Sequence, residues 1–287
     1  MMQMRSLLRK MRPDPEIEVR KIKAGRVPVL VLRPKDRPEE ALLPALLWIH
    51  GGGYFLGMKE MVYMGRAAGL VKKYGITVLS PGYRLALQSP YPAALQDCFR
   101  TLLYMKKHAA RLGIDENRIM VGGESAGGGL AAALCMLARD RGSVKIRYQF
   151  PLYPMLSCLD TESSRDNHGR VWNTKRNHLG WKLYLRKNAG GAVSPYASPG
   201  LQKDFRNLPP AYTFVGRGEP FYTETLEYVR KLREAGILAS ADVYPTDMHA
   251  FDMLDPDSEI SREAVRKFES KVYSVLISLR NPSMRLR

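Results

Sequence analysis

A serine flanked by glycines is the residue in this chain whose surroundings best suit nucleophilic chemistry. Ser125 lies in the stretch GESAG (123–127), directly after an apolar run at 118–121 and at the start of an alanine-rich segment at 126–141. A strand, a tight turn and a helix in this order would hold the hydroxyl on a strained turn at the carboxyl edge of a sheet, with the helix N-terminus favouring developing negative charge. We therefore expect Ser125 to be a nucleophile rather than an incidental residue of a glycine-rich turn.

A second glycine run follows an earlier apolar segment. His50-Gly51-Gly52-Gly53 comes directly after residues 45–49, which predict a buried strand. Acyl transfer through a serine needs two or three N–H donors aimed at the oxyanion, and glycines supply backbone N–H groups without side-chain obstruction. The run alone could be a flexible turn, but two such motifs in this order, each at the end of a strand, favour an oxyanion-binding loop.

A nucleophilic serine also needs a general base, and the sequence offers five histidines. Four of them have other expected positions, in the glycine run, inside a helix or within a polar insertion: His50, His108, His168 and His178. The fifth, His249, follows the last predicted strand and precedes the last predicted helix. An imidazole there would reach the same sheet edge as Ser125, so we predict that His249 is the base.

The acid that orients the base should lie after the preceding strand, in the chain order serine, acid, histidine. Glu219 lies in the loop after the apolar run 211–215 and is our candidate. Asp247 and Asp252 lie nearer to His249 in sequence and remain alternatives. As neighbours of the histidine on its own loop, they are better suited to capping or turning the backbone, which favours Glu219.

These residues need a sheet that brings strand ends together, and the pattern of apolar runs predicts one. Residues 17–33 alternate around Ala24-Gly25 and predict a hairpin. Short apolar runs that predict buried strands lie at 45–49, 76–79, 118–121, 146–152, 211–215 and 239–244. Helical segments are predicted at 64–74, 93–112, 126–141, 223–235 and 258–279, and three of them end at Gly113, Gly142 and Gly236. The last segment has an apolar stripe on one face, formed by Ala264, Phe268, Val272, Val275 and Leu279. The alternation predicts the α/β class, with a mostly parallel sheet flanked by helices in a single domain over 1–287.

One stretch, 157–208, interrupts this alternation. It is polar and turn-rich, with one predicted helix near 174–187 and no evident strand. An insertion of this length in an α/β domain is usually functional or disordered, and Trp172, Trp181 and Tyr184 could cover a cleft. We therefore expect a cap or lid at 157–208, to which the N-terminal residues 1–15 would contribute unless they form a frayed terminus.

Composition argues against several other classes of protein. The 45 Lys and Arg against 28 Asp and Glu give a formal charge of +17, but the cations are scattered through every segment, which favours a solvated basic surface over a nucleic-acid site. No apolar run reaches the about 18 residues of a membrane span, and the N-terminus lacks the pattern of a signal peptide. Three dispersed cysteines without metal-ligand spacing argue against disulfides and structural zinc. We expect a soluble, cytoplasmic protein without stable membrane insertion.

Taken together, the motifs resemble those of the hormone-sensitive-lipase-like family of α/β-hydrolase esterases, over nearly the whole chain. The stretches that carry the resemblance are HGGGYF (50–55), YRLA (83–86), YPAALQD (91–97), GGESAGG (122–128), SPYASP (194–199), LPPAYTFVG (208–216) and MHAF (248–251). The resemblance implies the α/β-hydrolase fold with a cap. It also implies a serine carboxylesterase that cleaves small-molecule esters of modest acyl length through an acyl-enzyme, without cofactor or metal. The oligomeric state is left open, a homodimer included.

Carried over residue by residue, the resemblance implies Ser125 as nucleophile, Glu219 as acid and His249 as base. Backbone amides would bind the oxyanion at Gly52, Gly53 and Ala126. Other motif residues would support these groups, namely His50, Gly51, Gly123, Glu124 and Gly127.

The chain departs from the family pattern at several positions. Family members often have Asp at positions 219 and 82 and Gly after the catalytic histidine, where this chain has Glu219, Gly82 and Ala250; LQ (87–88) replaces PE after YRLA. A Glu can orient the imidazole as an Asp does, with one methylene more. Gly82 and Ala250 could loosen the local support and thereby slow the reaction.

Other functions compatible with these motifs remain open. A deacetylase, lactonase or amidase would use the same triad. A ligand-binding pseudoenzyme on this scaffold, of the gibberellin-receptor kind, would be expected to lack a triad member, and the presence of His249 counts against it. A metallohydrolase is disfavoured because the sequence has no HxxEH-type spacing.

Overall fold

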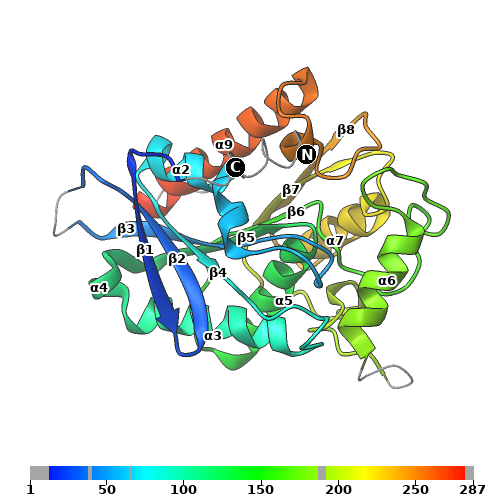
Figure 1. Ribbon diagram of the computed structural model, residues 1–287, viewed down its shortest axis with the longest axis horizontal. Helices are drawn as coiled ribbons and strands as arrows, with labels where there is room; N and C mark the ends of the chain where they lie inside the picture. Colours follow the sequence, from blue (N-terminus) through cyan, green and yellow to red (C-terminus); the bar gives the residue numbers. More distant parts are fainter. Residues whose placement is uncertain (1–12, 38–40, 65, 187–191, 282–287) are drawn as a thin grey trace.

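A mostly parallel sheet of eight strands forms the centre of the described part of the protein (Figure 1). The computed structural model describes residues 13–37, 41–64, 66–186 and 192–281, and its strands lie in the order β1-β2-β4-β3-β5-β6-β7-β8. Their bounds are β1 Ile17–Ala24, β2 Val27–Pro34, β3 Leu43–Ile49, β4 Thr77–Pro81, β5 Ile114–Glu124, β6 Gln149–Leu152, β7 Ala211–Gly216 and β8 Ala239–Tyr244. The predicted α/β class is therefore confirmed.

The directions of the strands explain where a site can form. β1 and β2 form the predicted hairpin, and β2 also runs antiparallel to β4. All other neighbouring strands are parallel, from β4 through β3 and β5 to β8. The central strands are buried along most of their length, as their continuous apolar runs predicted. Because parallel strands end at the same edge of a sheet, the loops after β3, β5, β7 and β8 meet there.

Helices cover both faces of the sheet (Figure 1). α2 and α9 bury one apolar cluster against one face, while α3, α5 and α7 bury a second cluster against the other. The bounds are α2 Arg66–Tyr74, α3 Ala93–Lys107, α4 Ala109–Leu112, α5 Ala126–Arg141, α6 Thr174–Leu185, α7 Tyr222–Glu234, α8 Phe251–Leu254 and α9 Glu259–Arg280. The predicted apolar stripe of the last helix is confirmed, since Ala264, Phe268, Val272 and Val275 are fully buried and Leu279 is partly buried against the same cluster.

The prediction of one continuous helix over 93–112 is wrong, because the chain breaks this helix at His108. α3 ends at Lys107 and α4 begins at Ala109, while His108 has φ −115° and ψ 26°. After the break, α4 turns back to the sheet and buries Leu112 beside the start of β5. Gly113 then adopts φ +64°, the left-handed conformation that ends helices, as the sequence predicted.

The segment 157–208 contains α6 and a short 3₁₀ helix (Pro199–Leu201), and its described residues form no strand. The rings of Trp181 and Tyr184 are buried, with centroids 5.3 and 4.0 Å from that of Tyr54 in the loop after β3. The predicted aromatic cover therefore contacts the loop that follows the glycine run. The role of residues 157–208 as a cap stays a prediction. Residues 1–15 were predicted to contribute to this cap, and residues 1–12 lie outside the described residues.

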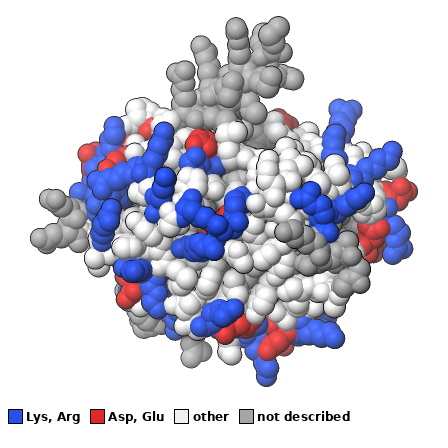
Figure 2. Space-filling model, turned by 60° about the horizontal axis from the view of Figure 1, so that its bottom comes forward, with Lys and Arg blue, Asp and Glu red and all other residues white. Residues whose placement is uncertain are grey.

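Lysine and arginine side chains are spread over the surface, as Figure 2 shows for one face. On this face they stand over a largely uncharged background with a few carboxylates between them. This distribution agrees with a solvated basic surface, and the absence of a nucleic-acid partner stays a prediction. Among the helices that the structure describes, none combines the length and the apolar character that a membrane crossing requires.

Candidate active site

Ser125 occupies the turn between β5 and α5, with φ +56° and ψ −122°. A residue with a side chain is strained at positive φ, and this is the strained turn that the motif predicted. Backbone hydrogen bonds hold the turn on both sides, from Ser125 N–H to Leu152 O (3.0 Å) and from Met155 N–H to Ser125 O (3.0 Å). The neighbouring strand β6 and the residues after it therefore fix the position of the serine.

Glycines allow the end of β3 to lie directly against this turn. A Cβ atom on Gly123 would lie 2.4 Å from Ile49 O, and one on Gly127 would lie 2.1 Å from the same oxygen. A Cβ atom on Gly51 would lie 3.2 Å from the Cβ atom of Ser125. The glycines thus allow the backbone after β3 to pass close to the serine, which brings the glycine run beside its side chain.

His249 lies in the loop between β8 and α8, with both ring nitrogens in hydrogen bonds. Nε2 is 2.8 Å from Ser125 Oγ, and Nδ1 is 2.5 Å from Glu219 Oε2. All three side chains are buried. The tautomer that satisfies both contacts has Nδ1–H donating to the carboxylate and Nε2 accepting from the hydroxyl, as proton abstraction from the serine requires. The structure therefore brings together the three residues predicted to act as nucleophile, acid and base.

Glu219 reaches the histidine from the loop after β7, the strand beside β8. Its other oxygen, Oε1, accepts the Gly216 N–H at 2.5 Å, which fixes the carboxylate against the end of its own strand. The competing Asp247 is exposed, and its side chain has no hydrogen bond within the described residues. The prediction that Asp247 caps this turn is wrong, because Thr246 Oγ1 accepts the Met248 N–H instead, at 3.1 Å.

Asp252, the second alternative acid, also does not cap the histidine loop as predicted. It lies in the first turn of α8, is buried, and forms an ion pair with Arg66 at the start of α2. A buried carboxylate needs a cation or several hydrogen bonds, so Asp252 is directed into the interior rather than to the loop backbone. The sequence carries no local signal for this pair, because its partners are far apart along the chain.

The amides predicted to bind an oxyanion lie on two elements that meet at Ser125. Gly52 and Gly53 have φ +114° and +60° in the loop after β3, and Ala126 is the first residue of α5. Among the described residues, no acceptor is bonded to the backbone N–H of these three residues. Unpaired N–H groups are expected in the first turn of a helix, and an oxyanion hole needs such donors. Binding of an oxyanion by these amides stays a prediction.

We expect Gly53→Ala to lower kcat by up to about 10²-fold while KM changes much less. The added Cβ would lie 2.2 Å from Trp172 Cη2, and φ +60° is unfavourable for alanine, so the loop must shift. Displaced amides would lose more affinity for the transition state than for the substrate. Steady-state kinetics on a p-nitrophenyl ester measures both constants.

The double variant Gly53→Ala/Trp172→Ala separates the two causes of that loss. Removal of the indole relieves the clash but leaves the backbone strain, so we expect part of kcat to return. An increase of KM at unchanged kcat in Gly53→Ala would show that the loop binds substrate only, contrary to the predicted role.

Aromatic rings enclose His249. The ring centroids of Phe221, Tyr153 and Trp172 lie 5.0, 5.1 and 6.4 Å from that of the imidazole. A dry, apolar surrounding strengthens the electrostatic interactions of groups inside it. Sequence reasoning singled out Trp172 but missed Phe221 and Tyr153. Their positions in the sequence could have indicated them, since Tyr153 directly follows β6 and Phe221 lies in the loop after β7.

His50 supports the glycine run rather than the acid–base chemistry. Its Nδ1 atom is 2.8 Å from Gly51 O, and its ring stacks on that of Tyr83 with centroids 4.1 Å apart. Burial lowers the pKa of His50 to about 4, so the imidazole is neutral near pH 7. This neutral, packed ring agrees with the supporting role that the motif suggested.

Two buried glutamates lie beside these elements. Burial raises the pKa of Glu124, the residue before Ser125, to about 7, although the charge of Arg66 opposes the shift. Burial likewise raises the pKa of Glu224 on α7 to about 8, although its carboxylate accepts the Leu156 N–H at 2.6 Å. Both carboxyl groups therefore keep a proton in the folded protein at pH values where the unfolded chain would lose it.

The buried carboxyl group of Glu224 should make the free energy of unfolding fall as the pH rises. Because its folded pKa of about 8 lies above the ordinary glutamate value of 4.5, its contribution is complete below about pH 4.5 and is lost progressively up to about pH 8. We expect the free energy of unfolding of Glu224→Gln to fall less between pH 5.5 and 8.5 than that of the parent, by up to a few kcal/mol, on the order of 1.4 per pKa unit. Urea titrations at both pH values test this, and an equal fall in both proteins would contradict it.

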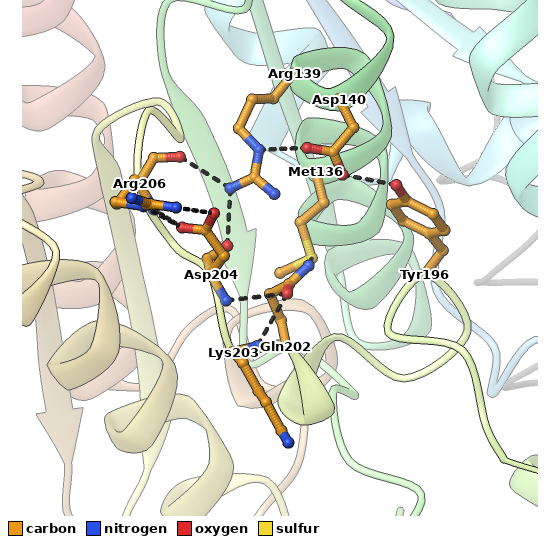
Figure 3. A network of polar contacts seen from close by, with 8 residues as sticks. All are labelled: Met136, Arg139, Asp140, Tyr196, Gln202, Lys203, Asp204 and Arg206. Carbon is orange, nitrogen blue, oxygen red and sulfur yellow. Dashed lines mark hydrogen bonds and ion pairs between the residues drawn. The ribbon is translucent and has the colours of Figure 1, made fainter.

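A separate cavity of about 560 Å³ lies between residues 202–206 and α7, and none of the predicted site residues lines it. Beside it, Arg139 of α5 donates to the carbonyl oxygens of Asp204 and Arg206 at 2.8 and 2.9 Å (Figure 3). The helix that begins at the serine is thereby tied to the end of the segment 157–208.

The part of the chain that the structure describes contains neither a disulfide nor a cluster of potential metal ligands. All three cysteines are free thiols. The described residues contain no group of three or more His, Cys, Asp and Glu that could hold a metal ion. That the protein needs neither metal nor cofactor stays a prediction.

Comparison with known proteins gives matches along most of the chain. Residues 46–253 match a family of the α/β hydrolase fold. A putative α/β hydrolase of Acanthamoeba polyphaga mimivirus is 28% identical over 232 residues, which are 79% of this chain but 65% of that protein. An arylesterase of Saccharolobus solfataricus is 31% identical over 247 residues, 83% of this chain and 78% of the relative.

Among solved structures, a bacterial heroin esterase is similar to the whole described fold. It superposes with a TM-score of 0.86 at 31% identity, over 97% of this chain and 89% of the esterase. The fold described above is therefore similar to that of a solved esterase.

Proposed function

Since this chain belongs to the hormone-sensitive-lipase-like family of the α/β hydrolase fold, we propose that it is a serine carboxylesterase. The resemblance predicted from the sequence motifs is confirmed by the family match. The proposed substrates are small-molecule carboxylic esters with short to medium acyl chains. No cofactor takes part in the proposed reaction.

One observation carries this proposal, the position of His249 between two partners. Its Nε2 lies 2.8 Å from Ser125 Oγ, and its Nδ1 lies 2.5 Å from Glu219 Oε2. A nucleophile, a base and an orienting acid in hydrogen-bond contact are what acyl transfer through a serine requires. The strained backbone of Ser125 and the unpaired amides beside it support the same chemistry.

In the proposed reaction, Ser125 Oγ attacks the ester carbonyl carbon while His249 Nε2 takes the hydroxyl proton. Glu219 stabilises the imidazolium, and the amides of the glycine run and of Ala126 would bind the oxyanion. Collapse of the tetrahedral intermediate breaks the bond to the alkoxide, which receives the proton from His249. Water, deprotonated by the same imidazole, then attacks the acyl-enzyme and releases the carboxylic acid and free Ser125.

A series of p-nitrophenyl esters from acetyl to long acyl chains tests this function and its proposed limit. The indole of Trp172 lies over Gly53 and near His249, where we expect it to limit the length of the acyl group. We expect the highest kcat/KM with acetyl to octanoyl esters and unchanged rates after dialysis against EDTA. No hydrolysis of any ester by folded protein would overturn the proposed function, and a loss restored by added zinc would indicate a metal site.

The same series distinguishes related activities. Rates on matched amides and lactones separate an esterase from an amidase or a lactonase, and acetylated sugars or amines test a deacetylase. A pseudoenzyme that only binds a ligand would hydrolyse none of these compounds. The cytoplasmic location, the absence of a nucleic-acid partner and a homodimer stay predictions, as does the cap role of residues 157–208.

A further inference from the structure

An arginine is buried on the face of the sheet that α2 and α9 cover. Arg66 begins α2, and only 8% of it is exposed. Its guanidinium carbon lies 5.6 Å from the ring centroid of Phe214 on β7 and 5.9 Å from that of Phe268 on α9. An arginine side chain is rarely buried unless it is paired with polar or acidic groups, so the groups that contact Arg66 indicate its role.

Both polar partners of Arg66 lie next to the catalytic histidine. Its guanidinium forms an ion pair with Asp252, whose side chain is fully buried. Nη2 also donates to the hydroxyl of Tyr153 at 3.3 Å. Asp252 stands three residues after His249, and the ring of Tyr153 meets the imidazole edge to face, with centroids 5.1 Å apart. The guanidinium of Arg66 is therefore connected to His249 in two ways, through Asp252 on the same loop and helix and through the ring of Tyr153.

The turn between His249 and α8 needs such an anchor. Ala250 joins His249 to α8 and has φ +56° and ψ +37°. This left-handed conformation is unfavourable for any residue that has a Cβ atom. The family that the sequence motifs resemble often has glycine at this position. The local conformational preference of alanine therefore disfavours the observed turn. The buried ion pair of Asp252, two residues further on in the first turn of α8, is placed to hold it.

We propose that Arg66 is a positioning residue that holds the imidazole of His249 in line with Ser125, by fixing Asp252 and the ring of Tyr153. The inference rests on the proposed serine hydrolase function. It predicts that neutralising Arg66 affects the geometry of His249 in protein that is otherwise folded.

Arg66→Met tests the inference, with Arg66→Lys as the conservative variant and Arg139→Met as the matched control. Arg139 is also a mostly buried arginine with polar contacts, but none of its partners touches His249 or Ser125. We expect kcat of Arg66→Met to fall about 10²-fold, the loss typical of a small misplacement of a catalytic group, with KM within about twofold. Arg66→Lys should recover part of kcat, and Arg139→Met should stay within about twofold of the parent.

Two further variants keep the test decisive if Arg66→Met folds poorly. Asp252→Asn breaks the pair from the other side and should reduce kcat as Arg66→Met does. The double variant Arg66→Met/Asp252→Asn leaves neither charge of the pair buried without its partner, and it should lose no more than the worse single variant, because both substitutions break the same ion pair. Rates are expressed per active site, counted with a phosphonate that titrates Ser125.

A readout other than activity separates positioning from stability. The proton between His249 Nδ1 and Glu219 should give a low-field resonance in the NMR spectrum of the parent and of Arg139→Met, and it should broaden or shift in Arg66→Met. An unchanged resonance together with kcat within twofold of the parent in Arg66→Met or Asp252→Asn would overturn the inference. Inactivity of the parent would instead overturn the proposed function, so the two failures are distinguishable.

Discussion

Ser125→Ala is expected to reduce the rate of ester hydrolysis by about 10⁴-fold or more, as the loss of a triad nucleophile does elsewhere. The variant keeps the glycine amides and His249, but it has no oxygen to form the acyl-enzyme. kcat on p-nitrophenyl butyrate at saturating substrate measures the loss.

The fold should survive this substitution. Among the described residues, the Ser125 hydroxyl has a hydrogen bond to His249 alone, and alanine can occupy the same turn at the same backbone strain. We expect the thermal midpoint of the variant to stay within a few degrees of the parent. A folded variant that retained most of its activity would contradict the serine mechanism.

Glu219→Gln is expected to cost up to about 10⁴-fold in kcat, because a neutral amide no longer stabilises the imidazolium or enforces the tautomer with a proton on Nδ1. Glu219→Asp should keep part of the rate, since it preserves the charge and shortens the side chain by one methylene. The measurement is kcat on the same ester for purified, folded variants.

Asp247→Asn is the matched control for the acid. Asp247 carries the same type of group two residues before the histidine, but it is exposed and does not contact the imidazole. Its kcat should stay close to that of the parent. A greater loss in Asp247→Asn than in Glu219→Gln, at equal folded content, would show that the acid is assigned to the wrong residue.

Much of the fold could be predicted because its strands are buried and its helices are amphipathic. Each apolar run corresponds to a strand, and the stripe on α9 is buried as its spacing indicated. The break at His108 could not be predicted, because helical periodicity continues on both sides of it. It depends instead on where Leu112 meets the sheet, which is a tertiary contact.

The site could be predicted as far as local motifs and strand order reach. The turn at Ser125 and the glycines that it requires are local features, and parallel strands bring the loops of Glu219 and His249 to the same edge. The ion pair of Arg66 with Asp252 left no local pattern, since two single residues at distant positions meet only in the folded chain. The role of Asp252 was therefore misjudged, although Asp252 was not chosen as the acid.

The central claim is that Ser125 forms a covalent acyl-enzyme with the help of His249. Reaction of the protein with a fluorophosphonate, followed by mass spectrometry of the intact chain and of its peptides, tests this most directly. We predict stoichiometric labelling at Ser125 in the parent, none in Ser125→Ala, and much slower labelling in His249→Ala. Folded parent protein that stays unlabelled, or that carries the phosphonate on another residue, would contradict the account.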